Sequence, residues 1–276
     1  MPLVNLIGKS RLYAQEFRFA LTAPVTLTEK CSLLKETARF HWRNWTKAAL
    51  PAGAGLQTFD LNLGGYRTLV YIRPEAGDMS IFQEVFARQS YHVDDAILDP
   101  KTVSAVFDLG ANAGYASLAF AARYPNARII SVEPNPENFA LLCKNTAAEP
   151  RIVPVQACVT AVPMEDAYIS GSGPAWSYQM NSSGRGTKVA GLTITDLMKA
   201  NAIAHIDFLK IDVEGAEREI FAKGDFLPNA NIVCAEIHGD YDLAAFNRDL
   251  APWGFSARIN PPGLDPQLML ATRNRQ

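Results

Sequence analysis

One stretch constrains the fold of this chain more than any other: residues 106–114, Val-Phe-Asp-Leu-Gly-Ala-Asn-Ala-Gly. Strand-forming residues come first, Gly110 and Gly114 bracket a turn, and apolar residues recur at helical spacing from Tyr115 onward. In an open α/β sheet, ligands lie beyond the carboxyl ends of the strands, and glycines in the turn let them approach the backbone. The stretch therefore predicts a buried strand, a turn and a helix that together form a cofactor site.

The spacing within this turn does not suit a dinucleotide. The fingerprint G-x-G-x-x-G needs glycines where Asn112 and Ser117 stand. Asp108, at the end of the strand, adds a negative charge that suits a cofactor with a cationic, amino-acid-like end. A second predicted strand ends in Glu133, whose carboxylate can accept two hydrogen bonds from a ribose diol. These features predict S-adenosylmethionine, with Asp108 toward its methionine end and Glu133 on its ribose.

From Ser104 onward, predicted strands and helices alternate, which indicates a doubly wound, mostly parallel α/β sheet. Asn135 is expected to cap the helix that begins at Pro136. The tail is expected to form a helix and a terminal hairpin. Further strands are predicted at residues 128–133, 151–157, 205–212 and 231–238. Residues 101–276 are therefore expected to form the cofactor-binding domain, and residues 1–100 a helical and β-hairpin extension that serves as lid or side wall.

Within the extension, Gly64-Gly65 between two alternating runs predicts a hairpin, and Asp78 is expected to cap a helix over residues 79–89. A longer helix is predicted over residues 29–50. Its apolar stripe, expected to pack on the body of the protein, comprises Leu34, Ala38, His41, Trp45 and Ala48. The basic residues on another face are interpreted as solvated, with an acidic substrate or anionic lipid head groups as the alternative contact.

A second group of chemically active residue types follows the fourth predicted strand of the domain. Lys210 and Asp212 face the same side of that strand, and a lysine near the core normally needs a partner carboxylate. Glu214 opens the next helix and is expected on the substrate side. Glu236 and His238 share a face of the following strand and are expected at the same sheet edge as Asp212.

Residues 159–190 interrupt the alternation and are rich in glycine, serine and proline. An insertion of this length is usually functional or mobile, and because it follows a strand it is expected to fold over the ligand edge. Trp176 and Tyr178 within it could stack on a sugar or a flat acceptor, and buried packing is an equal alternative.

Composition excludes several classes of protein. A net charge of −2 gives no basic field that would attract nucleic acid. The chain has no run of about 18 apolar residues and no signal-peptide hydrophobic region, so neither a transmembrane helix nor export is expected. The four cysteines are scattered without metal-ligand spacing, which indicates reduced thiols in a cytoplasmic protein.

Four motifs together resemble the FkbM family of S-adenosylmethionine-dependent methyltransferases. They are Phe-Asp-Leu-Gly-Ala-Asn-Ala-Gly (107–114), Val-Glu-Pro-Asn-Pro (132–136), Phe-Leu-Lys-Ile-Asp-Val-Glu-Gly-Ala-Glu (208–217) and Ala-Glu-Ile-His (235–238). The resemblance covers roughly residues 56–240 and implies a class I, Rossmann-like methyltransferase fold. It also implies O-methylation of hydroxyls on sugars, lipo-oligosaccharides or polyketide-type natural products. It places cofactor binding at Asp108, Gly110, Asn112, Gly114, Glu133 and Asn135, and Asp212 where the methionine end meets the acceptor.

Methyl transfer to a hydroxyl needs aligned reactants and a group that takes the hydroxyl proton. His238 has the most suitable intrinsic pKa, and Asp212 and Glu236 are the other candidates. Asp212 could instead hold the ammonium group of the cofactor. A divalent cation held by Asp212, Glu236 and His238 would be another way to acidify a sugar diol, although metal dependence is not expected.

The sequence therefore predicts an O-methyltransferase for a small-molecule hydroxyl acceptor, and the N-terminal helix could serve a homodimer. Two other classes remain open. A nicotinamide-dependent oxidoreductase would need the missing middle glycine. A non-catalytic cofactor-binding protein of the same fold would have no need of Asp212 and His238.

Overall fold

A computed structural model describes residues 3–48, 55–170, 179–181, 186–260 and 267–274. Internal contacts divide the chain into two compact units, Met1–Ser90 and Tyr91–Gln276. The sequence placed the corresponding boundary near residue 101. Each unit is described by itself.

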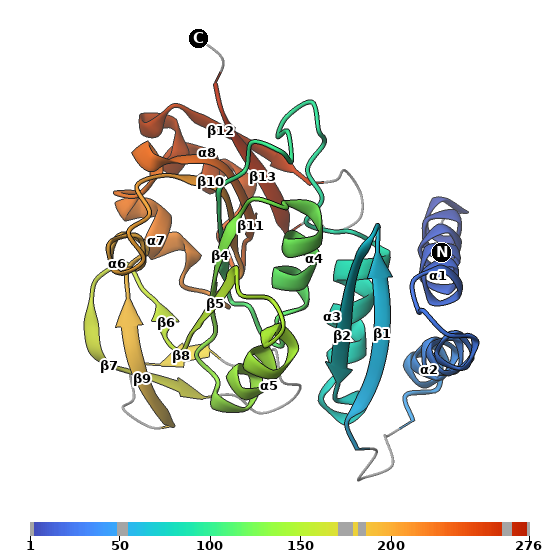
Figure 1. Cartoon of the computed structure of the whole chain (residues 1–276). Coiled ribbons are helices and arrows are strands. Elements are labelled where there is room, and N and C mark those ends of the chain that lie inside the picture. The colour runs from blue at the N-terminus through green and yellow to red at the C-terminus, as the bar shows by residue number, and fades with distance from the viewer. Residues whose placement is uncertain (1–2, 49–54, 171–178, 182–185, 261–266, 275–276) are drawn as a thin grey trace. The chain divides into compact units, whose positions relative to one another are not determined.

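The first unit combines helices with a two-stranded antiparallel hairpin (Figure 1). Leu63 pairs with Tyr66 around the two glycines, which confirms the predicted hairpin. Asp78 does not cap a helix, because its carboxylate accepts hydrogen bonds from the backbone and guanidinium of Arg73 and the cap position is Gly77. The elements are α1 (Leu3–Thr22), α2 (Leu27–Thr46), β1 (Gln57–Leu63), β2 (Tyr66–Ile72), η1 (Pro74–Ala76), α3 (Asp78–Phe82) and η2 (Gln83–Ala87).

The apolar stripe predicted for α2 is wrong at Ala38 and Trp45, whereas Leu34, His41 and Ala48 are half-buried. Leu33 and Thr37 are the buried residues of this helix, whereas Ala38 is exposed and Trp45 is 83% exposed. The prediction weighed apolarity alone, but packing against α1 and η2 sets the buried face. Gln83 on η2 donates a hydrogen bond from its buried amide to Thr37 Oγ1 at 2.9 Å, so the buried face of α2 includes a polar contact.

A seven-stranded sheet forms the centre of the second unit (Figure 1). Its order is β12-β13-β11-β10-β3-β4-β5, and all pairs are parallel except those of β13 with its two neighbours. This is the class I methyltransferase form of the Rossmann-like fold, which confirms the predicted fold class. The strands are β3 (Ala105–Leu109), β4 (Arg128–Val132), β5 (Ile152–Val155), β10 (Ile206–Ile211), β11 (Ala230–Glu236), β12 (Phe255–Ile259) and β13 (Leu268–Arg273).

Helices cover both faces of this sheet. Helices α4 and α5 lie on one face, and α6, α7 and α8 pack on the other over a large apolar core (Figure 1). The predicted helix and terminal hairpin of the tail are present as α8, β12 and β13. The helices are α4 (Tyr115–Arg123), α5 (Pro136–Thr146), α6 (Ile194–Ala200), α7 (Glu217–Lys223) and α8 (Leu243–Leu250), with short turns at η3 (Leu227–Asn229) and η4 (Ala251–Trp253).

The described part of the 159–190 insertion contributes to a second sheet, of four strands in the order β6-β9-β7-β8. These strands are β6 (Cys158–Val159), β7 (Met164–Ser170), β8 (Gln179–Asn181) and β9 (Thr187–Leu192). Trp176 and Tyr178 lie outside the described residues, so their role in substrate stacking stays a prediction.

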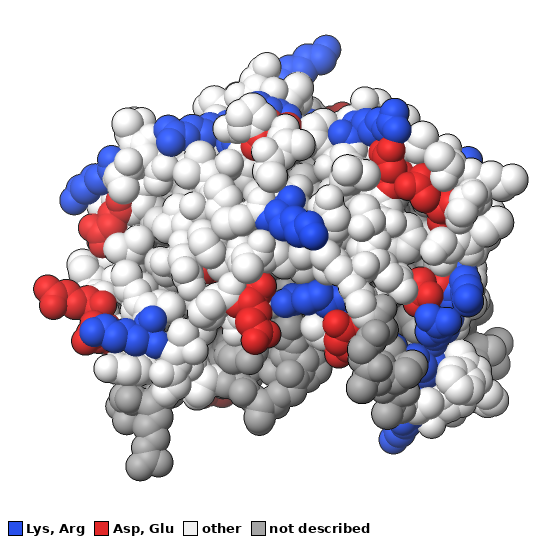
Figure 2. Space-filling view, turned by 60° about the horizontal axis from the view of Figure 1, so that its bottom comes forward, with Lys and Arg blue, Asp and Glu red and all other residues white. Residues whose placement is uncertain are grey.

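On the face shown in Figure 2, positive and negative side chains are interspersed among uncharged ones. Such a face carries no broad field of a single sign. Among the described helices, none combines the length and the apolar character that a membrane crossing requires.

Candidate active site

The turn after β3 packs directly against the chain that leaves β10. Gly110 has a φ of +79°, and a Cβ on it would lie 1.7 Å from the backbone oxygen of Asp212. Gly114 has a φ of +83°, and a Cβ there would lie 2.7 Å from Leu142 Cδ1. Asn112 has a φ of +49°, a left-handed conformation that asparagine tolerates better than most residues. The glycines are therefore required by close packing as well as by backbone conformation.

Glu133 follows β4, and its buried carboxylate binds the same turn. Oε2 accepts the backbone N–H of Asn112 at 2.9 Å, and Oε1 accepts the backbone N–H of Asn135 at 2.9 Å and the Nδ2–H of Asn138 at 3.3 Å. Burial raises the pKa of Glu133 to about 7, although these hydrogen bonds act to lower it. Since a carboxylate offers about four acceptor sites, roughly one stays free for another donor.

Asn135 caps α5 as the sequence predicted, accepting the backbone N–H groups of Glu137 and Asn138 through Oδ1. The side chain of Asn112 likewise bonds within the protein, because its Oδ1 accepts the backbone N–H of Ala113. Both side-chain oxygens therefore already serve the local structure of the turn and the helix start.

Lys210 joins the ends of β3 and β10. Its Nζ lies 3.3 Å from Asp108 Oδ1 and 3.8 Å from Asp212 Oδ2, and it donates to the carbonyl oxygen of Gly110 at 2.7 Å. Asp108 Oδ2 also accepts a hydrogen bond from Ser117 Oγ at 2.6 Å. Burial would lower the pKa of Lys210, but the charges of Asp108 and Asp212 outweigh it and raise that pKa. The expected pairing of this lysine with carboxylates is confirmed.

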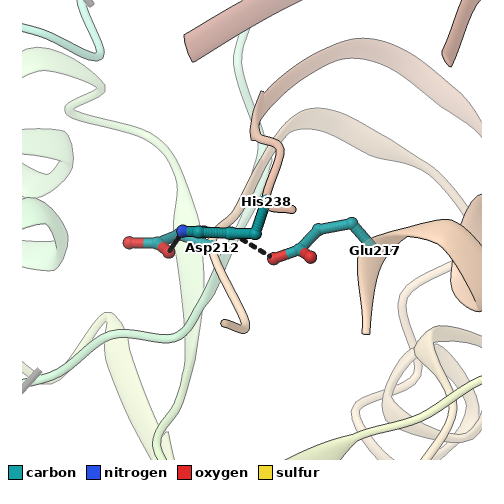
Figure 3. Close-up of side chains that lie close together, drawn as sticks. All are labelled: Asp212, Glu217 and His238. Carbon is teal, nitrogen blue, oxygen red and sulfur yellow. Dashed lines mark hydrogen bonds and ion pairs between the residues drawn. The ribbon is translucent and has the colours of Figure 1, made fainter. Parts of the chain in front are cut away.

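His238 lies just beyond β11, and carboxylates surround its ring. Its Nδ1 is 3.0 Å from Glu217 Oε1 (Figure 3), and its Nε2 lies 3.9 Å from Asp212 Oδ1. The same Nε2 lies 3.8 Å from oxygens of both Glu214 and Glu236. Burial alone would lower the pKa of His238, but the hydrogen bond with Glu217 and the neighbouring charges raise it to about 9.

The residues predicted to meet at this sheet edge, Asp212, Glu214, Glu236 and His238, are therefore brought together. Burial and the charge of Asp212 raise the pKa of Glu214 to about 7. Burial also raises the pKa of Asp212, against the opposing charges of Lys210 and His238. The edge holds more negative than positive groups, and their titrations depend on one another.

Glu217 is a buried member of the site, and no role was predicted for it from the sequence. It stands at the start of α7, and it also accepts the backbone N–H groups of Val213 at 3.0 Å and Gly215 at 2.9 Å. The available signal was a carboxylate in the first helical turn, within the last residues of the third motif.

The site fits a ligand that carries positive charge. Asp212 Oδ1 is buried and accepts no hydrogen bond from any described residue, which suits an ammonium or sulfonium group. A metal ion is a poorer fit. Asp212, Glu217 and His238 do offer ligand atoms within 4.8 Å of one another, but Glu217 uses both oxygens for hydrogen bonds.

Comparison with known proteins identifies a family and several similar proteins. A family described as the methyltransferase FkbM domain matches residues 108–251, just over half of the chain. The hexuronic acid methyltransferase AglP of Haloferax volcanii is 23% identical over 175 residues, which span 61% of this chain and 70% of that protein. The AMB antimetabolite synthetase AmbE of Pseudomonas aeruginosa is 33% identical over 91 residues, 33% of this chain but only 4% of that protein. Among solved structures, a METTL16 methyltransferase domain has 13% identity and a TM-score of 0.47, covering 100% of this chain and 93% of that one.

The family match removes the nicotinamide-dependent oxidoreductase as an alternative and makes S-adenosylmethionine the methyl donor. The chain belongs to the FkbM family of S-adenosylmethionine-dependent methyltransferases.

Proposed function

We propose that this methyltransferase acts on a hydroxyl group of a sugar, glycoside or related small molecule, and that His238 accepts the hydroxyl proton. The observation that carries the proposal is the orientation of the imidazole. Its Nδ1 is engaged by Glu217, so its Nε2 is the nitrogen that faces Asp212 at the sheet edge. A positioned base of this kind typically contributes about 10²–10⁴-fold to the rate.

Other residues of the chain would bind and align the reactants. The remaining acceptor site on Glu133 suits a ribose hydroxyl, and Asp212 Oδ1, which accepts no hydrogen bond from a described residue, suits the ammonium group. When bound, S-adenosylmethionine supplies an electrophilic methyl group. The enzyme's own task is then to orient the acceptor and remove its proton, which is why a base beside Asp212 matters.

The charge of the edge favours a neutral acceptor. Asp212, Glu214 and Glu236 surround Nε2, so a carboxylate acceptor would meet like charges in a poorly solvated site. A carboxylate acceptor is also already deprotonated at neutral pH, so its methylation would not need His238 as a base. A uronic acid, the substrate class named for the Haloferax relative, offers both groups, so we expect hydroxyl and not ester methylation here.

Labelled methyl transfer to neutral glycosides and to uronic acids tests the acceptor class, with the position of the new methyl group read by NMR. Ester products would contradict the proposal. Saturable cofactor binding without turnover on any acceptor would instead support the non-catalytic alternative.

The variant His238→Gln tests the base. We expect kcat to fall about 10²–10⁴-fold while cofactor affinity stays within about twofold. Because only the neutral ring accepts a proton, kcat/KM of the wild type should rise with pH toward about 9, the pKa of His238. The matched control is His205→Gln, since the side chain of His205 is 44% exposed. Weakened cofactor binding with unchanged turnover at saturation would remove His238 from this role.

A further inference from the structure

Glu217 is a buried carboxylate with three hydrogen-bond donors around it, and the function proposed above uses only one of these contacts, the one with His238 Nδ1. We propose that Glu217 is a positioning residue that fixes the orientation and the protonated nitrogen of His238 and, with the same carboxylate, holds the turn that presents Glu214. The inference rests on the proposed function of His238.

The first step concerns the imidazole ring. Glu217 Oε1 lies 3.0 Å from His238 Nδ1, and an ionised carboxylate can only accept a hydrogen bond. Nδ1 must therefore carry a proton, which leaves Nε2 as the unprotonated nitrogen of the neutral ring. Because the ring is tethered at Nδ1, the lone pair of Nε2 is held toward Asp212, Glu214 and Glu236.

The second step concerns the turn between β10 and α7. Glu214 has a φ of +56°, which is unfavourable for a residue with a Cβ, and Gly215 follows with a φ of +111°. Glu217 binds the backbone N–H on each side of Glu214, those of Val213 and Gly215. One carboxylate thus fixes both the histidine and the turn that brings the Glu214 carboxylate to 3.8 Å from Nε2.

An amide cannot replace this carboxylate. Oε1 accepts from Val213 and lies against His238 Nδ1, and Oε2 accepts from Gly215. Whichever way a glutamine side chain turned, its NH₂ group would face at least one N–H donor. Glu217→Gln therefore keeps the volume of the side chain and removes its charge and part of its bonding. Glu219→Gln is the matched control, because Glu219 lies exposed on the same helix.

The first experiment measures kcat and the affinity for S-adenosylhomocysteine at a pH on the plateau of the rate profile. Glu217→Gln should lower kcat about 10–100-fold, part of the roughly 10²–10⁴-fold that a positioned base supplies, with affinity within about twofold. In a His238→Gln background it should lower kcat no further. Glu217 would not act through His238 if kcat of Glu217→Gln equalled that of Glu219→Gln. The same conclusion would follow if the losses of kcat in Glu217→Gln and His238→Gln multiplied in the double variant.

The second experiment follows the ring of His238 by long-range ¹H–¹⁵N NMR, with its signals assigned by their loss in His238→Gln. The pKa of His238 should fall from about 9 in Glu217→Gln, because an anion that stabilises the imidazolium is lost. The neutral ring should change from the Nδ1–H form to a mixture of both tautomers. The other charged groups near the ring are the same in the wild type and in Glu217→Gln, so they do not account for a difference in pKa. These groups are Asp212, Glu214, Glu236 and, behind them, Lys210.

The kinetic and NMR measurements together distinguish the positioning role of Glu217 from the base role of His238. If the pKa and tautomer of His238 stay as in the wild type, the positioning role is wrong even where turnover falls. If both change while His238→Gln retains full activity, positioning holds and the base assignment fails. Circular dichroism melting of each variant checks that a loss of kcat does not come from unfolding, and the NMR comparison needs only folded protein.

Discussion

Replacing Lys210 with methionine would leave Asp108 without its counter-ion and Asp212 with His238 alone. The side chain of Lys210 is 3% exposed, and its Nζ lies 3.3 Å from Asp108 and 3.8 Å from Asp212. Methionine has a similar length but neither the charge nor the hydrogen bond to the Gly110 carbonyl. Removing one partner of a buried ion pair typically costs about 3–5 kcal/mol. We expect Lys210→Met to lower the free energy of unfolding by that amount at neutral pH.

Urea denaturation at pH 8, followed by circular dichroism, measures this loss. Lys223→Met is the control, since Lys223 and Asp225 form a half-exposed pair at 3.1 Å and such pairs contribute about 0–1 kcal/mol. Adding Asp108→Asn to Lys210→Met should recover part of the stability, because the orphaned negative charge is then removed. The double-mutant cycle should give a coupling energy above about 1 kcal/mol.

The pH dependence has a definite sign. Because the charges of Asp108 and Asp212 raise the pKa of Lys210 above its unfolded value, its contribution is fully present below the unfolded pKa. That contribution is lost only as pH rises through the higher folded pKa. A loss below about 1 kcal/mol for Lys210→Met, or an additive cycle, would refute the view that this ion pair holds the two strand ends together.

Two further predictions concern the cofactor half of the site. Glu133→Gln should weaken S-adenosylhomocysteine binding about 10–100-fold by calorimetry at a pH above 7, the approximate pKa of Glu133, because a hydrogen bond to a charged acceptor contributes about 1.5–3 kcal/mol. The variant Glu137→Gln is the control and should bind normally, since Glu137 is exposed. Equal affinities of Glu133→Gln and the wild type would show that Glu133 does not bind the ribose. Gly110→Ala should destabilise the fold by about 3 kcal/mol or more in denaturant titrations, since its Cβ would lie 1.7 Å from a backbone oxygen. Gly254→Ala, with a similar φ of +74° and nothing within 4 Å, should cost only about 1 kcal/mol, and an equal cost at both positions would contradict the packing argument.

Much of the second unit could be predicted because its signals are local. Residues 105–123 contain a run of strand-forming residues, a glycine turn and apolar residues at helical spacing. The same residues form β3, the turn and α4 in the structure. Parallel strands all place their carboxyl ends at one sheet edge, so a polar residue at each end locates the site without any contact being known. That rule is sufficient to bring Asp212 and His238 together. It does not specify which nitrogen of the ring faces the edge.

The parts that could not be predicted depend on contacts between distant residues. The buried face of α2 depends on contacts with residues far along the chain, such as the bond between Thr37 and Gln83, 46 positions apart, and no periodicity within the helix contains that information. Glu217 and His238 are 21 positions apart, and a carboxylate in the first turn of a helix is usually explained by the helix dipole alone. Only the folded geometry distinguishes the two explanations. A carboxylate that only interacts with the helix dipole could stay solvated. Glu217 is instead 1% exposed, and its oxygens accept hydrogen bonds from the turn before α7 and contact the imidazole of His238.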